Sequence, residues 1–243
     1  MDQSFLVGTL VACVSVLYAT AGQAGGTAFL AVMAFAAFPA IEMRATALLL
    51  NIVAAGYATW HVHRVVGLDQ KILLQVTVPS LLAAFVGGLL GLDGRVYFVL
   101  TGLLLLAAAG LMLFKRSADR IEAKPVRALP AALVGGGAGF ISGLTGVGGG
   151  VFLTPMLLAF GWASPRRTAM LSPPFILGNS ILGLAGVLLG GQRLAPSATL
   201  YAIAALGGAV VGTAVGLRWM SEQATRYALA AVLLLAGVRL IFR

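Results

Sequence analysis

Charged residues are scarce in this 243-residue chain: they make up 9% of the sequence, while hydrophobic residues make up 60%. The mean hydropathy is +1.02. A soluble domain of this size needs far more polar surface than such a composition supplies. The composition therefore excludes a soluble globular protein and predicts an all-α polytopic membrane protein.

Cysteine and histidine are almost absent. Cys13 is the only cysteine, which excludes an internal disulfide and a cysteine-rich metal site. The only histidines, His61 and His63, lie at the end of a predicted span, far from the glycine-rich segment that contains Ser142. An intramembrane serine protease, the enzymatic alternative, needs a histidine base beside its serine. No phosphate-binding loop of the Gly-x-x-x-x-Gly-Lys-Ser/Thr type is present either, so we expect no enzymatic activity, no metal and no cofactor.

Acidic residues are absent from the predicted spans. All seven lie near the N-terminus or between spans, at Asp2, Glu42, Asp69, Asp93, Asp119, Glu122 and Glu222. Cation and proton pumps usually need a carboxylate on the pathway, because a cation inside hydrocarbon requires a counter-charge. The absence of such a group favours an anion as the substrate.

Basic residues are present in excess, with a net charge of +9, and they gather in loops and at span ends. Five of them lie in a polar linker, 115–129, which separates a first transmembrane repeat, 1–114, from a second, 130–243. The positive-inside rule predicts that this linker is cytoplasmic. The charge therefore reports membrane topology, with the lipid bilayer as partner, and does not indicate nucleic-acid binding. The first apolar run is not a cleaved signal peptide, because Asp2 stands where a basic n-region would be.

The apolar residues form about eight segments in a four-plus-four order, at 5–38, 44–60, 71–91, 95–114, 130–161, 167–189, 196–217 and 224–242. A helical span needs about 20 residues. The first segment of each half, with 34 and 32 residues, is too long. Each could be one long tilted helix, or two shorter helices that enter the membrane and turn back.

These two possibilities predict different topologies. With single crossings the two repeats are parallel, and Lys and Arg divide ten to six in favour of the linker side. With re-entrant segments the repeats are inverted, and the division is eleven to five. The charge rule therefore barely separates them. We favour inverted repeats, because a pseudo-two-fold axis in the membrane plane brings two broken segments to one midplane site and provides alternating access.

Each long segment contains a glycine cluster. The second cluster, from Gly139 to Gly150, holds six glycines, and a weaker copy at 21–27 stands 124 positions earlier. Each glycine inside a helix costs about 1 kcal/mol relative to alanine. Glycine-broken segments at matching places in two repeats are typical of a transporter's binding site. An unwound segment there would expose N–H groups, which attract negative charge together with the positive end of a helix dipole.

We therefore expect a small anionic substrate to be bound by backbone and polar side chains of both clusters. The backbone candidates are Gly22, Gly25, Gly26, Gly146, Gly148, Gly149 and Gly150. The side-chain candidates are Gln23, Thr27, Arg44, Asn51, Ser142, Thr145, Thr154, Arg167 and Ser172. Glycines of the third span in each half, at 87, 88, 91, 207, 208 and 212, are interpreted instead as close helix packing.

Four of these side chains have a second interpretation. Arg44 and Arg167 each open the span after a broken segment. They would attract or hold the anion, or they would be cations at the membrane interface. Asn51 and Ser172 lie further along the same spans, where they either line the pathway or bond neighbouring helices.

Several of these motifs together resemble the sulfite exporter TauE/SafE family, also called the toluene sulfonate uptake permease family. They are the second glycine cluster with Pro155, the double glycines of the third spans, Arg-Thr-Ala-Met at 167–170, and the ending Leu-Leu-Leu-Ala-Gly-Val-Arg-Leu-Ile-Phe at 233–242. The resemblance covers nearly the whole chain. It implies a multi-pass secondary transporter of the bacterial inner membrane that moves sulfite or an organosulfonate. A non-transporting membrane scaffold is the alternative, and the sequence leaves a homodimer open.

Overall fold

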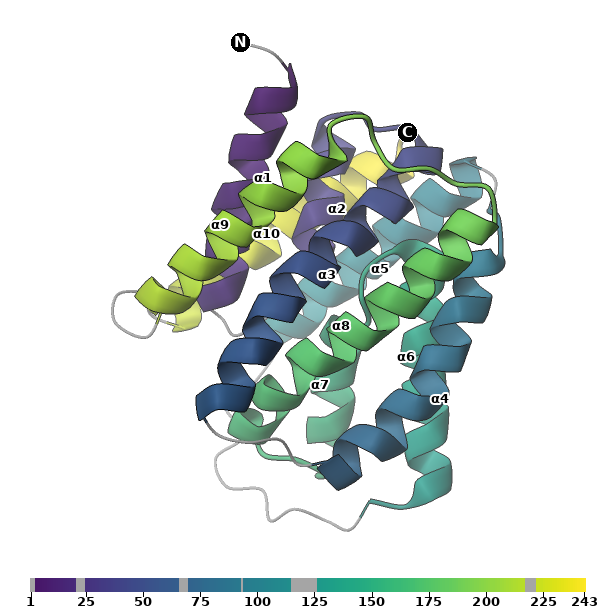
Figure 1. The fold of residues 1–243 in the computed structure, drawn as a ribbon, viewed down its shortest axis with the longest axis vertical. Helices are drawn as coiled ribbons and strands as arrows, with labels where there is room; N and C mark the ends of the chain where they lie inside the picture. Colours follow the sequence, from purple (N-terminus) through teal and green to yellow (C-terminus); the bar gives the residue numbers. More distant parts are fainter. Residues whose placement is uncertain (1–2, 21–24, 66–69, 93, 115–125, 217–221) are drawn as a thin grey trace.

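A computed structural model describes residues 3–20, 25–65, 70–92, 94–114, 126–216 and 222–243. These residues form ten α-helices and no strand (Figure 1). The helices are α1 (Gln3–Thr20), α2 (Gly26–Phe35), α3 (Ala40–Val65), α4 (Gln70–Leu89), α5 (Gly94–Phe114), α6 (Ala128–Thr145), α7 (Gly150–Ala159), α8 (Pro165–Leu189), α9 (Ala198–Gly216) and α10 (Glu222–Ile241). The all-α prediction is confirmed.

Each overlong apolar segment consists of two helices. The first segment holds α1 and α2, and the second holds α6 and α7, so the single long helix is wrong for both. Each of the other six segments forms one helix. Within the described ranges, six helices are long and apolar enough to cross a membrane, while α2 and α7 have only 10 residues each. The protein is therefore a polytopic membrane protein in which the first span of each half is followed by a short helix.

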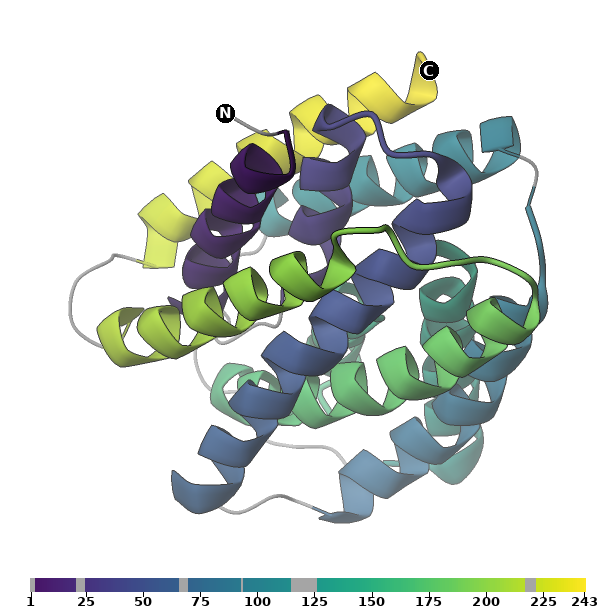
Figure 2. The ribbon, with the colours of Figure 1, turned by 45° about the horizontal axis from the view of Figure 1, so that its top comes forward.

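The helix neighbours in one half correspond to those in the other. α1 packs on α9 as α6 packs on α4, and α2 packs on α3 as α7 packs on α8. α3 also packs on α8, and α5 on α10, so the two halves interleave (Figure 2). α1 and α6 begin at opposite ends of the molecule (Figure 1). Neither half encloses a core of its own.

Glycines allow α6 to pack with its backbone against α4. A Cβ placed on Gly135, Gly139 or Gly143 would lie 2.0, 2.1 or 2.0 Å from a backbone oxygen of α4. The spacing of four residues puts all three on one face of α6, which is the small-xxx-small arrangement of membrane helices. Gly87 of α4 contacts α6 in the same way, as the packing interpretation expected, whereas Gly91, beyond the end of α4, has open space around it.

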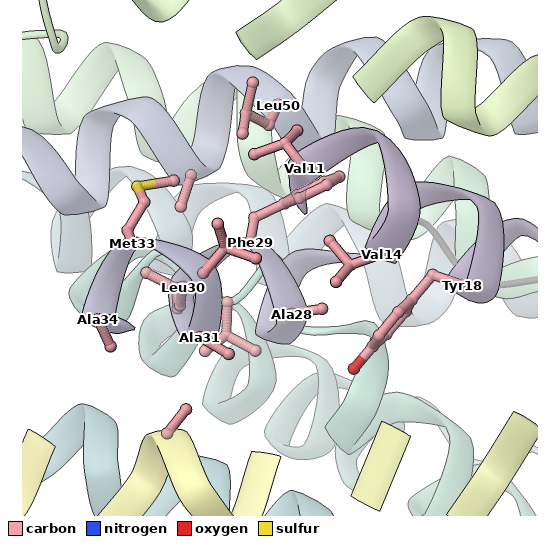
Figure 3. Close-up of a cluster of buried hydrophobic side chains, with 14 of the residues drawn as sticks. Val11, Val14, Tyr18, Ala28, Phe29, Leu30, Ala31, Met33, Ala34 and Leu50 are labelled. Atoms are coloured by element: carbon pink, nitrogen blue, oxygen red, sulfur yellow. The ribbon is translucent and has the colours of Figure 1, made fainter. Parts of the chain in front are cut away.

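The short helices differ in their surroundings. All residues of α2 from Gly26 to Ala34 are buried, and α2 lies in the centre of a cluster with α1 and α3 (Figure 3). Only three residues of α7 are buried, namely Gly150, Leu153 and Leu157. The two repeats therefore share an order of helices but not a degree of burial, and α2 is the more enclosed of the two short helices.

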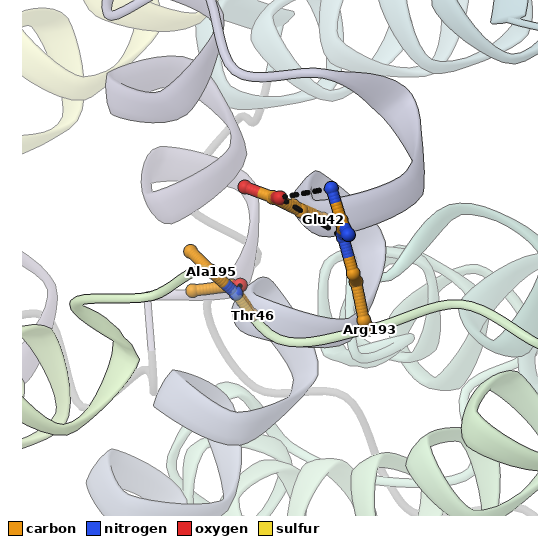
Figure 4. A network of polar contacts seen from close by, with 4 residues as sticks. All are labelled: Glu42, Thr46, Arg193 and Ala195. Atoms are coloured by element: carbon orange, nitrogen blue, oxygen red, sulfur yellow. Dashed lines mark hydrogen bonds and ion pairs between the residues drawn. The ribbon is translucent and has the colours of Figure 1, made fainter.

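A loop of the second half is attached to the start of α3. Arg193 pairs with Glu42 at 3.2 Å, and the Ala195 N–H donates to the Thr46 hydroxyl at 2.9 Å (Figure 4). The backbone N–H of Arg193 also donates to the Ile41 carbonyl at 3.2 Å. These contacts hold the α8–α9 connection across the beginning of α3.

Candidate substrate site at two helix breaks

Both short helices begin at a glycine whose backbone is in the left-handed region, which residues other than glycine rarely adopt. The N-cap of α2 is Gly25, with φ of 88°, and the N-cap of α7 is Gly149, with φ of 76°. Neither N-cap supplies a side-chain hydrogen bond. The first N–H groups of a helix have no partner inside it. Each break therefore presents an uncapped, positive helix end.

The two breaks are in contact. A Cβ placed on Gly26 would lie 2.0 Å from the Val147 carbonyl oxygen, so no side chain fits between the two segments at this point. The start of α2 therefore lies against the segment 146–149 that leads into α7, so the two halves of the molecule meet at the breaks. Two predicted residues of the first break, Gly22 and Gln23, lie outside the described residues.

Asn51 of α3 lies between the two breaks. Its amide nitrogen is within 3 Å of a Cβ placed on Gly26 or Gly148, at 2.9 and 2.8 Å. The same nitrogen donates to the Gly146 carbonyl at 3.3 Å. The Asn51 side-chain oxygen is buried and has no partner in the described part of the chain. A buried acceptor without a partner is costly, and only a hydrogen-bond donor could satisfy it, so this oxygen does not itself hold an oxyanion.

The predicted hydroxyl groups fall into two places. Ser142, Thr145 and Thr27 lie at the breaks. The Ser142 hydroxyl is buried with no partner among the described residues, the Thr145 hydroxyl donates to the Ile141 carbonyl at 2.6 Å, and the Thr27 hydroxyl bonds the Tyr18 hydroxyl. Thr154 and Ser172 bond each other at 3.3 Å between α7 and α8, one turn beyond the break. They therefore lie outside the group of hydroxyls at the breaks.

Arg44 is completely buried, so its interpretation as a cation at the membrane interface is wrong. Its guanidinium donates to the carbonyls of Gly88, Leu90 and Leu144 at 3.1, 2.9 and 3.1 Å, and to the Gln192 side chain at 3.0 Å. These bonds use four of the five N–H groups that a guanidinium carries. Arg44 joins the ends of α4 and α6 and leaves little capacity for a substrate.

Arg167 has different surroundings from Arg44. Its side chain is exposed at the start of α8, and its backbone N–H donates to the Ser164 hydroxyl at 3.4 Å. The two arginines open equivalent spans but do not occupy equivalent environments, so they are not a matched pair around the site.

Tyr97 contributes to the site without a signal in the sequence. Its buried hydroxyl donates to the Thr145 carbonyl at 3.1 Å, from an otherwise apolar stretch of α5. Gln192 was missed for a similar reason, because it lies in a connection and its partner Arg44 is 148 positions away. Only the polar character of a tyrosine inside an apolar span could have drawn attention to Tyr97.

The described residues contain no group of three His, Cys, Asp or Glu side chains that could hold a metal ion. The groups at the breaks are two helix N-termini, the Asn51 amide and the Ser142 hydroxyl, together with the Arg44 guanidinium, whose N–H groups bond carbonyls and Gln192. Two helix ends together carry roughly one positive elementary charge. Such an arrangement can hold a small anion through N–H and O–H donors.

Comparisons with known proteins place the chain among membrane transporters. A family model described as Sulfite exporter TauE/SafE matches residues 6–240. A curated relative, the probable membrane transporter protein y4hK of Sinorhizobium fredii (strain NBRC 101917 / NGR234), is 31% identical over 233 residues, which is 94% of each chain. No solved structure matches the chain.

Proposed function

Because the chain belongs to the sulfite exporter TauE/SafE family and is a membrane transporter, not an enzyme, we propose that it moves a small sulfur oxyanion, sulfite or an organosulfonate. The family confirms the resemblance seen in the sequence and places the protein, with its six long apolar helices, as a multi-pass protein of the bacterial inner membrane. The observation that carries the proposal is the contact between the start of α2 and the segment 146–149 that leads into α7, one from each half.

The chemistry of the breaks supports an anion. In the first turn of each helix the Ala28 and Phe152 N–H groups bond the N-cap carbonyls of Gly25 and Gly149. The two N–H groups that precede them in each helix have no partner inside the helix. Backbone donors and the positive end of a helix dipole bind sulfate-like oxyanions without any positively charged side chain. The acidic residues all lie outside the apolar segments, so no carboxylate within these segments opposes the anion.

The residues of the site have three roles in this proposal. The backbone at Gly25, Gly26 and 146–150 binds the oxyanion together with the Thr27 side chain, and Gly22 and Gln23 are kept as substrate-binding residues from the sequence alone. The Ser142, Thr145 and Asn51 side chains supply further polar groups, and Thr154 with Ser172 continues the pathway toward Arg167. Arg44 has a positioning role, because its donors are occupied by carbonyls.

Inverted repeats would give this site access from both sides in turn. The corresponding helix neighbours of the two halves and the opposite starting ends of α1 and α6 support the inversion. In an inverted pair, the conformations of the two halves exchange when the transporter switches sides. The greater burial of α2 than of α7 is the kind of difference that such an exchange would reverse.

Transport by purified protein in liposomes tests the proposal. Counterflow of labelled sulfite should be observed, and sulfite, sulfate, thiosulfate, taurine and sulfoacetate should each be compared as competitors. Thermal stabilisation of the detergent-solubilised protein by the same compounds gives an independent reading of binding. A protein that none of these anions stabilises, and that exchanges none of them, would be a membrane scaffold or a carrier of another substrate.

A further inference from the structure

The end of α6 is covered by side chains of the other half. Three consecutive carbonyls, those of Leu144, Thr145 and Gly146, each accept a hydrogen bond. The donors are Arg44 at 3.1 Å, Tyr97 at 3.1 Å and Asn51 at 3.3 Å, in the same order. All three donors are buried, and all belong to the first repeat. The carbonyls belong to the second repeat and directly precede α7.

The covering has an electrostatic consequence. The last carbonyls of a helix carry roughly half a negative elementary charge. At this break the negative end of α6 and the positive end of α7 are separated only by residues 146–149. Carbonyls so near the start of α7 would repel the anion that the α7 N–H groups attract if no donor covered them. Arg44 also bonds the Gly88 and Leu90 carbonyls at the end of α4, so its one charge offsets two helix ends.

We propose that Arg44, Tyr97 and Asn51 are positioning residues that set the charge preference of the transport site by covering the negative end of α6. This inference rests on the proposed anion transport and goes beyond it, because it says which groups make the break selective for negative charge. Tyr97 and Arg44 act from behind the break, through the carbonyls, and need no contact with the substrate.

The test removes one covering group and compares two substrates of different charge. Tyr97→Phe keeps the ring and deletes the hydroxyl that bonds the Thr145 carbonyl. Tyr201→Phe is the matched control, since Tyr201 is also a buried tyrosine but lies on α9, where it packs against Phe38. Apparent affinities are measured for sulfite, at a pH where it is a dianion, and for methanesulfonate, which is a monoanion.

The energy of a charge near an exposed carbonyl is proportional to that charge. The fold-loss for the dianion should therefore be about the square of the loss for the monoanion. We expect Tyr97→Phe to weaken binding of methanesulfonate about threefold and of sulfite about tenfold, which corresponds to about 1.4 kcal/mol for sulfite. Tyr201→Phe should leave both affinities unchanged. If Tyr97→Phe does not accumulate in the membrane, Asn51→Ser takes its place as the test variant. The serine hydroxyl is too short to reach the Gly146 carbonyl, so the ratio of the two affinities should change in the same direction.

A merely structural role for Tyr97 would reduce the amount of active transporter and leave the ratio of the two affinities as in the wild type. Variants that transport with an unchanged ratio would therefore overturn this inference and leave the proposed function standing. A wild-type protein that transports neither anion would overturn both.

Discussion

Single residues at the breaks divide into those that touch the proposed substrate and those that shape its surroundings. Gly149 belongs to the first kind, because its left-handed backbone is the N-cap of α7, where the first N–H groups have no partner inside the helix. Arg44 belongs to the second, because its hydrogen bonds end on carbonyls and on Gln192. The difference gives substitutions at these positions different expected outcomes.

Gly149→Leu should reduce transport to less than a tenth while the protein still reaches the membrane. A side chain there would be strained at φ of 76°, and its Cβ would lie 3.1 Å from Phe175 and 3.2 Å from the Ala138 carbonyl. Gly207→Leu is the control, since a Cβ there meets open space. Sulfite counterflow at matched protein amounts provides the measurement, and Gly149→Ala gives a milder version. Normal concentration dependence in a folded Gly149→Leu protein would contradict the site.

Arg44→Gln and Arg167→Gln should fail in different ways. Arg44→Gln leaves buried carbonyls unpaired, each at about 1–3 kcal/mol, and should lower the unfolding temperature strongly. Arg167 is exposed, so Arg167→Gln should leave stability nearly unchanged. If Arg167 steers the anion, its loss should weaken apparent affinity less than tenfold, and the effect should shrink at high salt. Thermal unfolding measures the stability of each variant, and transport at two salt concentrations measures its apparent affinity. Equal stability of the two variants would contradict the role of Arg44.

At the scale of the helices, α6 depends on its contact with α4 for its place. The contact is made by backbone, with Gly139 facing the Ser80 carbonyl and Gly143 facing the Ala84 carbonyl. Gly137 of the same helix faces open space and is exposed. Gly137 and Gly139 are two positions apart on α6. Substitutions at these two positions therefore distinguish the effect of helix packing from the effect of helix propensity.

Gly139→Ala should destabilise the protein by several kcal/mol, because its Cβ would lie 2.1 Å from the Ser80 carbonyl and the helices would have to separate. Gly137→Ala should be neutral or stabilising by up to about 1 kcal/mol, since alanine is the better helix former. Thermal unfolding in the same detergent compares them. A smaller loss for Gly139→Ala than for Gly137→Ala would mean that α6 and α4 do not pack through this face.

Much of this helical arrangement could be predicted from the sequence, and the reasons are particular. Long apolar segments marked the helices, and the glycines at 146–150 marked the break, because glycine is a poor helix former. The burial of Arg44 could not be predicted, since an arginine at the start of a span is usually interfacial. Its partners Leu144 and Gln192 lie 100 and 148 positions away. Contacts over such distances leave no pattern in one sequence, and Tyr97 was missed for that reason too.

The whole molecule is one interleaved body, since α1 packs on α9 and α4 on α6. The two halves therefore cross the membrane side by side, and each is oriented either the same way as the other or inverted. Inverted repeats would give an odd number of crossings in each half, so the C-terminus and the linker 115–129 would be on opposite sides of the membrane. Parallel repeats would put them on the same side.

Fusion reporters can decide between these topologies. A reporter inserted in the linker should be active as a cytoplasmic fusion, by the positive-inside rule. A reporter after Arg243 should be active only as a periplasmic fusion if the repeats are inverted. A fusion after Phe114 at the start of the linker provides the matched control for the cytoplasmic side. Cytoplasmic activity after Arg243 would show that the repeats are parallel.

The bonds of Arg44 also constrain how the protein is made. Gly88 and Leu90 follow Arg44 closely in the chain, but Leu144 and Gln192 belong to the second half. At a synthesis rate of about 5–20 residues per second, roughly 7 to 30 s pass between the addition of Arg44 and that of Gln192. Until Leu144 is added, the newly made first half carries a guanidinium that lacks two of its four final acceptors, and from then until Gln192 is added it lacks one. The insertion machinery, or water at the membrane surface, must accommodate this charge until the second half arrives.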